Sequence, residues 1–333
     1  MNSREIIKRC IEFTGPERIG YEFTPPHPSD FVHGGWGRAS RLVYEEEDPT
    51  IREEVPDFPG QLYRDAYGSI WGRLNDRHSG EVVKGVLQDG WHKLDGYQLP
   101  DFVSPRLYDD VEAHFAAFPD AYKVGMLPGF PFAIMRYMRR MDHFLMDLLV
   151  HEREVLRLNE MVVAMLLGCI DNWARIGADG VMFAEDWGTQ DRLLVSPALW
   201  RRLFKPSFQV LVERAHAHGL HVLMHSCGYI YEIIEDLIEV AIDVLQLDQP
   251  ELLGVERLSR EFGGRIAFFC PVDIQRVMQT GDKATIQREA RRMVELLGCF
   301  NGGFMAKDYP QWEAIGVPDE WAQWAREAFM ERN

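Results

Sequence analysis

Basic residues are few relative to acidic ones in this chain of 333 residues, and the imbalance excludes two classes of partner. The sequence has 36 Lys and Arg against 52 Asp and Glu, which gives a formal net charge of -16. Nucleic acids and anionic membrane surfaces both require clustered Lys and Arg to displace their counterions. We therefore expect no nucleic-acid partner and no membrane partner, whereas a local basic pocket for an anionic substrate is compatible with this charge.

The chain also lacks a disulfide pattern and a long apolar run. Its 5 cysteines are scattered without paired spacing, unlike the framework of a small secreted protein. The longest apolar run, residues 161–170, is much shorter than the roughly 20 residues that a membrane-spanning helix needs. No charged-then-apolar leader opens the sequence. These absences predict a cytoplasmic protein.

No Gly/Ser-rich linker and no repeat divides the chain, so we expect a single domain over residues 1–333. From residue 123 onwards, short apolar runs alternate with longer amphipathic segments, a pattern typical of βα units and a parallel sheet. The predicted strands cover 18–23, one run within 66–73, 123–127, 180–184, 221–228, 243–247, 265–269 and 303–306. Eight such units predict an α/β fold, the (β/α)8 TIM barrel, whose active sites lie at the C-terminal ends of the strands.

Residues 30–106 lack this alternation, and we expect them to form an irregular insertion over the barrel mouth. Within them, 66–73 and 81–87 have the character of two strands, and the polar loop 75–80 between them favours a β-hairpin. The Gly-rich loop 33–38 has no strand-loop-helix context that would mark a phosphate cradle, so we interpret it as a surface turn.

The strand that ends in His-Val-Leu-Met-His-Ser-Cys-Gly, residues 221–228, carries the strongest chemical signal. Side chains alternate along a strand, so His225 and Cys227 point to the same face. Cys270 ends the next strand but one, and the three side chains together would offer Zn²⁺ three ligands and leave a fourth position open, as in catalytic zinc sites. The alternative is structural, because a histidine at a strand end often serves hydrogen bonding and a free cysteine often packs as a small hydrophobe.

Carboxylates follow two other strands and are the candidate catalytic groups. Glu185 and Asp186 point to opposite faces of their strand, so at most one of them aims directly into the mouth; hydrogen bonding to the following turn is the alternative. Asp248 has the phase of Gln246 and is expected to face the barrel interior. Asp273 is interpreted as the cap of the next helix, a role that Asp fills well.

Three further polar residues at strand ends are candidates for substrate binding. Gln249 follows the strand 243–247, and Lys307 and Asp308 follow the strand 303–306. In a barrel these ends meet around one mouth.

Several segments resemble the uroporphyrinogen decarboxylase superfamily, and more narrowly its branch of cobalamin-dependent methyltransferases. The resemblance rests on residues 177–190, Ser196-Pro197, His225-Ser226-Cys227-Gly228 and Asp248-Gln249-Pro250. It is good over 177–308 and general before that. It implies the (β/α)8 barrel that the strand pattern also predicts.

The resemblance separates two activities. The decarboxylases carry an Arg-Gln-Ala-Gly-Arg segment after strand one and an Asp after strand two, and here residues 23–27 have no Arg and residues 68–72 no Asp. The methyltransferases hold zinc with His-x-Cys after strand five and a Cys after strand eight. His225 and Cys227 match the first part, but residues 305–308 contain no Cys.

Three solutions remain open for the missing ligand. Cys270 takes its place, a carboxylate such as Glu185 or Asp248 does, or the site serves another purpose.

The sequence therefore favours a zinc-dependent methyltransferase that moves a methyl group between a corrinoid (cobalamin) and a small thiol or methylated substrate. A separate corrinoid carrier protein is the expected partner, and Trp321 and Trp324 favour a homodimer. One alternative is a metal-independent decarboxylase acting on a tetrapyrrole or another carboxylate. Another is a non-enzymatic barrel that binds a corrinoid or tetrapyrrole.

Overall fold

The structure, a computed structural model, describes residues 1–35, 49–75 and 80–331. Eight parallel strands form one sheet in the order β1-β11-β10-β9-β8-β7-β6-β2. Their bounds are β1 (Gly20–Glu22), β2 (Phe31–Gly34), β6 (Tyr122–Met126), β7 (Gly180–Ala184), β8 (His221–His225), β9 (Val244–Gln246), β10 (Ala267–Cys270) and β11 (Phe304–Lys307). The two end strands also meet, because the amide of Asp30, next to β2, donates to the carbonyl of Tyr21 in β1 at 2.8 Å.

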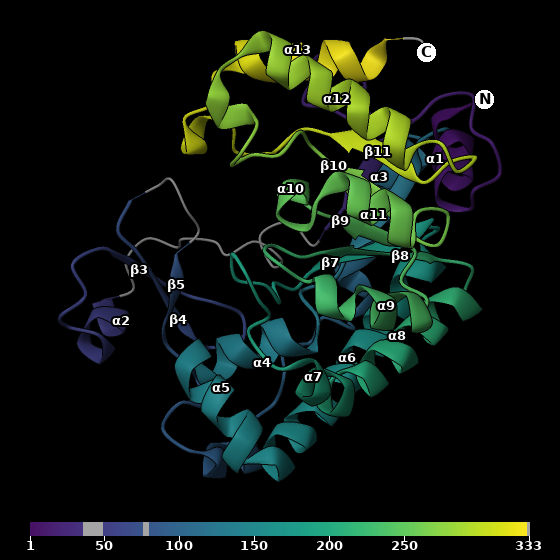
Figure 1. The fold of residues 1–333 in the computed structure, drawn as a ribbon. Helices are drawn as coiled ribbons and strands as arrows, with labels where there is room; N and C mark the ends of the chain where they lie inside the picture. Colours follow the sequence, from purple (N-terminus) through teal and green to yellow (C-terminus); the bar gives the residue numbers. More distant parts are fainter. Residues whose placement is uncertain (36–48, 76–79, 332–333) are drawn as a thin grey trace.

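These strands make a nearly closed barrel with helices around it, so the predicted (β/α)8 fold is confirmed (Figure 1). The helices are α1 (Ser3–Ile11), α2 (Pro49–Glu54), α3 (Asp109–Ala116), α4 (Pro131–Arg139), α5 (Met141–Val150), α6 (Glu152–Arg175), α7 (Pro197–Leu203), α8 (Lys205–Ala217), α9 (Tyr231–Glu239), α10 (Pro250–Leu253), α11 (Val255–Phe262), α12 (Lys283–Leu297) and α13 (Asp319–Met330). None of the helices in the described ranges has both the length and the apolar character needed to cross a membrane.

The interior of the barrel is apolar at its N-terminal end. Inward side chains such as Tyr122, Leu223 and Phe269 form one buried cluster with Ile6 and Ile7 of α1. Helix α1 therefore closes this end of the barrel. Alternate residues of the same strands belong to the large cluster between the sheet and the surrounding helices. This alternation fixes which residues at the other end face the mouth.

The second barrel strand differs from the predicted one. It is β2, within residues 30–106, so part of the segment expected to be an insertion belongs to the barrel itself. The run within 66–73 does form a strand, β4 (Ile70–Arg73), but in a separate antiparallel sheet with β3 (Gln61–Arg64) and β5 (Glu81–Lys84). This sheet lies beside the barrel next to α2 (Figure 1).

The predicted hairpin is confirmed by the antiparallel pairing of β4 with β5. Residues 76–79 of its loop, and residues 36–38 of the Gly-rich loop, lie outside the described ranges. The expectation of a surface turn at 33–38 is wrong at its first two residues, since His33 and Gly34 belong to β2 and pair in register with Val124 and Gly125 of β6.

Candidate metal centre and active site

The C-terminal end of β8 brings His225 into the barrel mouth. His225 shares the inward phase of Leu223, while Val222 and Met224 pack against the outer helices. Cys227 follows two residues later, and its Sγ lies 3.3 Å from Nε2 of His225. The predicted convergence of these two side chains is therefore seen in the structure.

Asp186, at the end of β7, completes a group of three potential metal ligands. Its Oδ1 lies 3.5 Å from Nε2 of His225, and the donor atoms of Asp186, His225 and Cys227 all lie within 4.8 Å of one another. The backbone amide of Cys227 also donates to Oδ1 of Asp186 at 2.8 Å, which orients the carboxylate.

These spacings fit a zinc ion. With ordinary zinc–ligand bond lengths and tetrahedral angles, N and S ligands lie about 3.6 Å apart and N and O ligands about 3.4 Å apart. The spacings of 3.3 Å from Cys227 and 3.5 Å from Asp186 to the histidine nitrogen agree with these values. One nitrogen, one sulfur and one oxygen ligand would leave a fourth position for a substrate atom.

The neighbouring strand determines which nitrogen of His225 carries the proton. Gln246, on β9, directs its amide nitrogen to the carboxylate of Asp248 at 2.7 Å, and its oxygen therefore accepts from Nδ1 of His225 at 2.5 Å. The lone pair of the neutral imidazole is then on Nε2, facing Cys227 and Asp186. Hydrogen bonds of this kind orient metal-binding histidines in proteins.

The surroundings of Cys227 favour its protonated thiol when no cation is bound. Burial raises its pKa well above the ordinary value, and the charges of Asp186 and Asp248 raise it further. A coordinated metal ion reverses this balance, because thiolates are the ligand form of cysteine.

The two adjacent carboxylates after β7 have different positions, as their opposite phases predict. Glu185 is fully buried away from the metal group and accepts hydrogen bonds from the amide of Ala133 at 3.1 Å and from Nε1 of Trp187 at 3.0 Å. Burial raises the pKa of Glu185 to about 8, against the opposing effect of these hydrogen bonds. Glu185 thus connects β7 to the first turn of α4, while Asp186 is the carboxylate at the mouth.

Cys270 is not part of the metal group. It has the phase of Phe268, and both side chains pack in the cluster between the sheet and the helices, whereas Phe269 points into the barrel. Asp248 faces inward as predicted, but it contacts Gln246 and Lys307 rather than the three ligands. The structure therefore supplies Asp186 in place of Cys270, Glu185 or Asp248 as the third potential ligand.

Of the three predicted substrate-binding residues, Lys307 faces the barrel mouth, and Gln249 and Asp308 hold neighbouring segments of the chain in place. Lys307 faces inward, with Nζ 3.4 Å from Oδ1 of Asp248. Oε1 of Gln249 accepts from the amide of Gly228 at 3.2 Å. Asp308 points outward and accepts from Nε of Arg326 at 3.0 Å. Asp273 was expected to cap the next helix, but it caps the turn after β10 by accepting from the amides of Gln275 and Arg276, and the next α-helix, α12, has Asp282 as its N-cap.

Two inward residues were not identified from the sequence. Glu22 ends β1 and forms an ion pair with His33 of β2. Burial acts to raise the pKa of Glu22, but the charge and hydrogen bond of His33 outweigh burial and lower it. The signal was present in the spacing, because Glu22 follows the inward Gly20 by two residues and His33 follows the inward Phe31 by two. Recognising this signal for His33 required the correct assignment of the second barrel strand, β2.

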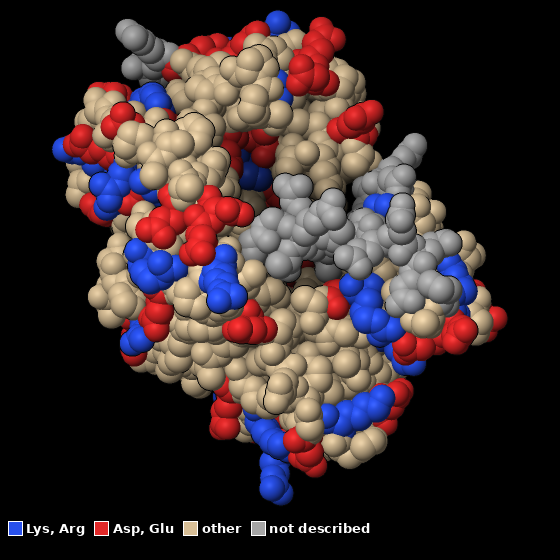
Figure 2. Space-filling model, turned by 180° about the vertical axis from the view of Figure 1, so that it is seen from behind, with Lys and Arg blue, Asp and Glu red and all other residues tan. Residues whose placement is uncertain are grey.

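A cleft of about 750 Å³ opens beside the mouth, between the segment after β1 and the segment after β11. Tyr309 lines it, and burial followed by the charges of Asp248 and Cys227 raises the pKa of this tyrosine. The cleft therefore adjoins the candidate metal centre. From behind, the molecule is visibly hollowed, with acidic and basic side chains inside the hollow (Figure 2).

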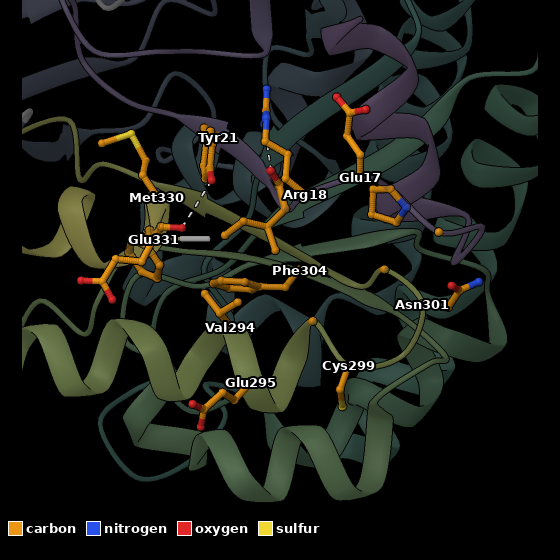
Figure 3. A pocket seen from close by; sticks show the side chains of 16 residues that line it. Glu17, Arg18, Tyr21, Val294, Glu295, Cys299, Asn301, Phe304, Met330 and Glu331 are labelled. Carbon is orange, nitrogen blue, oxygen red and sulfur yellow. Dashed lines mark hydrogen bonds between the residues drawn. The ribbon is translucent and has the colours of Figure 1, made fainter. Parts of the chain in front are cut away.

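A larger cleft, of about 1030 Å³, lies near the N-terminal ends of β1 and β11. Val294 of α12 and Tyr21 of β1 are among the side chains that line it (Figure 3). None of the predicted site residues lines this cleft, so size does not identify the active site here.

The fold and these donors define a (β/α)8 barrel with a candidate metal centre at its C-terminal mouth. The profile of the uroporphyrinogen decarboxylase (URO-D) family matches residues 88–306, well over half of the chain. The chain therefore belongs to this family. No curated protein sequence matches it.

One of the similar solved structures shares the fold over the whole chain. A methyltransferase from Methanosarcina mazei superposes with a TM-score of 0.66 at 14% identity, covering 99% of this chain and 100% of that one. A D-psicose 3-epimerase from Clostridium cellulolyticum H10 reaches a TM-score of 0.42 at 11% identity, covering 90% and 96% of the two chains. At 14% identity the first likeness establishes the barrel fold alone.

Proposed function

We propose that the protein is a zinc-dependent methyltransferase that moves a methyl group between a corrinoid and a small thiol or methylated substrate. One observation carries the proposal: Asp186, His225 and Cys227 converge at the barrel mouth within 4.8 Å. Such a set of N, S and O donors suits Zn²⁺. Membership of the URO-D family and the fold shared with the Methanosarcina mazei methyltransferase support it.

The residues at and around the metal centre have distinct roles in this reaction. Asp186, His225 and Cys227 would hold the metal, and Gln246 keeps the Nε2 lone pair of His225 directed towards it. Bound zinc would supply Lewis acidity, which favours the thiolate form of a substrate thiol or polarises the atom that bears the methyl group. Lys307 and Asp248 face the same space and would orient the polar end of the substrate.

The alternative, a decarboxylase of a tetrapyrrole or another carboxylate, finds less support in the site. Such a substrate needs cations for its carboxylates. Lys307 at the mouth is paired with Asp248, and Arg326, which lines the adjoining cleft, is paired with Asp308.

Metal analysis tests the proposal first. We expect protein purified without chelators to contain about one zinc ion per chain, and Cys227→Ser and His225→Ala to lose it. Cys270→Ala is the matched control, since this cysteine packs outside the barrel and its loss should leave the zinc content unchanged. Zinc retained by Cys227→Ser, or lost from Cys270→Ala alone, would contradict the ligand set.

An optical assay then tests the reaction. Zinc-loaded protein mixed with methylcobalamin and a panel of small thiols should convert the methylcobalamin spectrum to that of the demethylated corrinoid, and Cys227→Ser should not. Release of CO2 from a porphyrinogen that persists in the presence of chelators would instead establish the decarboxylase alternative.

A further inference from the structure

A second polar pair faces the barrel interior on the side away from the candidate metal centre. Nε2 of His33 is hydrogen bonded to Oε1 of Glu22. In the sheet order, β11, β10 and β9 separate β1 from β8, and β6 and β7 separate β2 from β8. In a barrel of eight strands, the pair on β1 and β2 therefore faces His225 across the mouth.

A chain of charged and polar contacts connects the two sides. Lys307 is the register partner of Glu22, and its charge acts on both Glu22 and His33. Its Nζ also contacts Asp248, which Gln246 joins to His225. Within residues 1–35, 49–75 and 80–331, Glu22 and Lys307 are the charged groups that act on His33.

A contribution to folding stability does not by itself account for the Glu22–His33 ion pair. Ion pairs that lose much of their hydration often stabilise a fold no more than apolar side chains of similar size would. The side chains of His33 and Glu22 keep only 33% and 25% of their exposure. Perturbed ionisable groups in a cleft are typical of functional sites.

Among the residues that the structure describes, the pair engages one nitrogen of His33 and leaves the other without a partner. Nε2 is engaged by Glu22, while Nδ1 makes no hydrogen bond to any residue within the described ranges. A carboxylate that binds one imidazole nitrogen orients the ring and stabilises its protonated form, and the other nitrogen then exchanges a proton with a substrate.

We propose that Nδ1 of His33 accepts the proton that a substrate thiol loses at the barrel mouth, with Glu22 holding the imidazole in place. The inference rests on the function proposed above. The S–H bond breaks, the proton moves to Nδ1, and both electrons remain on sulfur, so nothing is oxidised or reduced. In the reverse direction the imidazolium returns the proton to the leaving atom. His33 is thus a catalytic residue and Glu22 a positioning residue.

The electrostatics of the pair agree with this role. Burial acts to lower the pKa of His33, but the charge and hydrogen bond of Glu22 outweigh burial and raise it above its ordinary value. A raised pKa favours the protonated imidazole, which is the form that results when Nδ1 takes up the thiol proton.

Proton counting tests the inference without knowledge of the natural substrate. Calorimetric titration of zinc-loaded protein with 2-mercaptoethanol, in buffers of different ionisation enthalpy, gives the protons released per thiol bound. The negative charge of the bound thiolate should raise the pKa of His33. At a pH between its pKa in the free protein and its higher pKa in the complex, wild type should retain the thiol proton, whereas His33→Gln should release about one proton more. His114→Gln, an exposed histidine on α3, is the matched control and should behave as wild type.

The role of Glu22 is tested in metal-free protein. An NMR titration should show the pKa of His33 falling in Glu22→Gln, because the amide keeps a hydrogen-bonding oxygen but has no charge. An unchanged pKa would remove Glu22 from the proposal.

The outcomes separate this inference from the proposed function. If neither zinc nor thiol binds, the proposed function fails and the inference fails with it. If both bind, but wild type and His33→Gln release the same number of protons, the inference alone is overturned.

Discussion

At the scale of single residues, the hydrogen bonds of Gln246 decide whether His225 can bind a metal. Asp248 accepts from the amide nitrogen of Gln246, so the amide oxygen is left for Nδ1 of His225. An imidazole held this way presents a lone pair at Nε2, and the ring cannot turn without losing its partner.

We therefore expect Gln246→Leu to weaken zinc binding by about 10- to 100-fold, the usual effect of losing such a partner. Competition with a chromophoric chelator measures the affinity. Gln246→Glu keeps an acceptor for Nδ1 and should lose less. The urea midpoint of the metal-free variants shows whether they fold, and an affinity of Gln246→Leu equal to that of wild type would contradict the argument.

The residues of the site were predictable where alternation along a strand is visible in the sequence. The shared face of His225 and Cys227 follows from their spacing of two residues, and the opposite faces of Glu185 and Asp186 follow from their being adjacent in the strand. Cys270 was misplaced because its strand, Ala-Phe-Phe-Cys over 267–270, is buried on both faces. Such a strand has no polar side to mark its phase.

At the scale of elements, the strands that can be predicted from the sequence are those formed by a clear run of apolar residues. Seven barrel strands were predicted close to their observed positions. β2 was missed because it has only four residues, Phe31–Gly34, shortly after Pro25, Pro26 and Pro28. The run within 66–73 has a stronger strand character and was assigned to the barrel. Only tertiary packing places it elsewhere, through the ring of Trp71, 4.7 Å from that of Tyr137 on α4.

The separate sheet contains a carboxyl whose titration should be measurable. Asp65, between β3 and β4, accepts from the amide of Ser69 at 2.8 Å and from Nε1 of Trp71 at 2.7 Å. Burial nevertheless raises the pKa of Asp65 to about 6. The unfolded chain releases this proton at a pH of about 4, so the unfolded state is favoured progressively as the pH rises from about 4 to about 6.

We expect Asp65→Asn to remove this dependence. Between pH about 4 and about 7, wild type should lose roughly 1–2 kcal/mol of unfolding free energy more than the variant, after allowance for partial solvent screening. Urea unfolding at several pH values measures the difference, in which the other titrating groups cancel. Parallel pH profiles for the two proteins would show that Asp65 titrates normally.

At the scale of the whole molecule, the apolar end of the barrel is closed by α1 and the polar end is supported by the C-terminal segment. Asp308 lies where these parts meet. It accepts from Nε of Arg326 on α13 at 3.0 Å and from the amide of Thr24 after β1 at 2.7 Å. Both side chains are buried, with Arg326 keeping 3% and Asp308 7% of their exposure. The pair joins the first strand, the last strand and the last helix.

Removing one partner of this pair should therefore lower the free energy of unfolding far more than removing both. Arg326→Met leaves a buried carboxylate without its cation and should cost about 3–5 kcal/mol in unfolding free energy. The double variant Asp308→Asn with Arg326→Met should recover a large part of this loss, which a double-mutant cycle in urea measures. Arg291→Met is the matched control, because its pair with Glu331 is exposed and should contribute at most about 1 kcal/mol. Equal losses for Arg326→Met and Arg291→Met would show that the C-terminal helix is not held to the barrel by this pair.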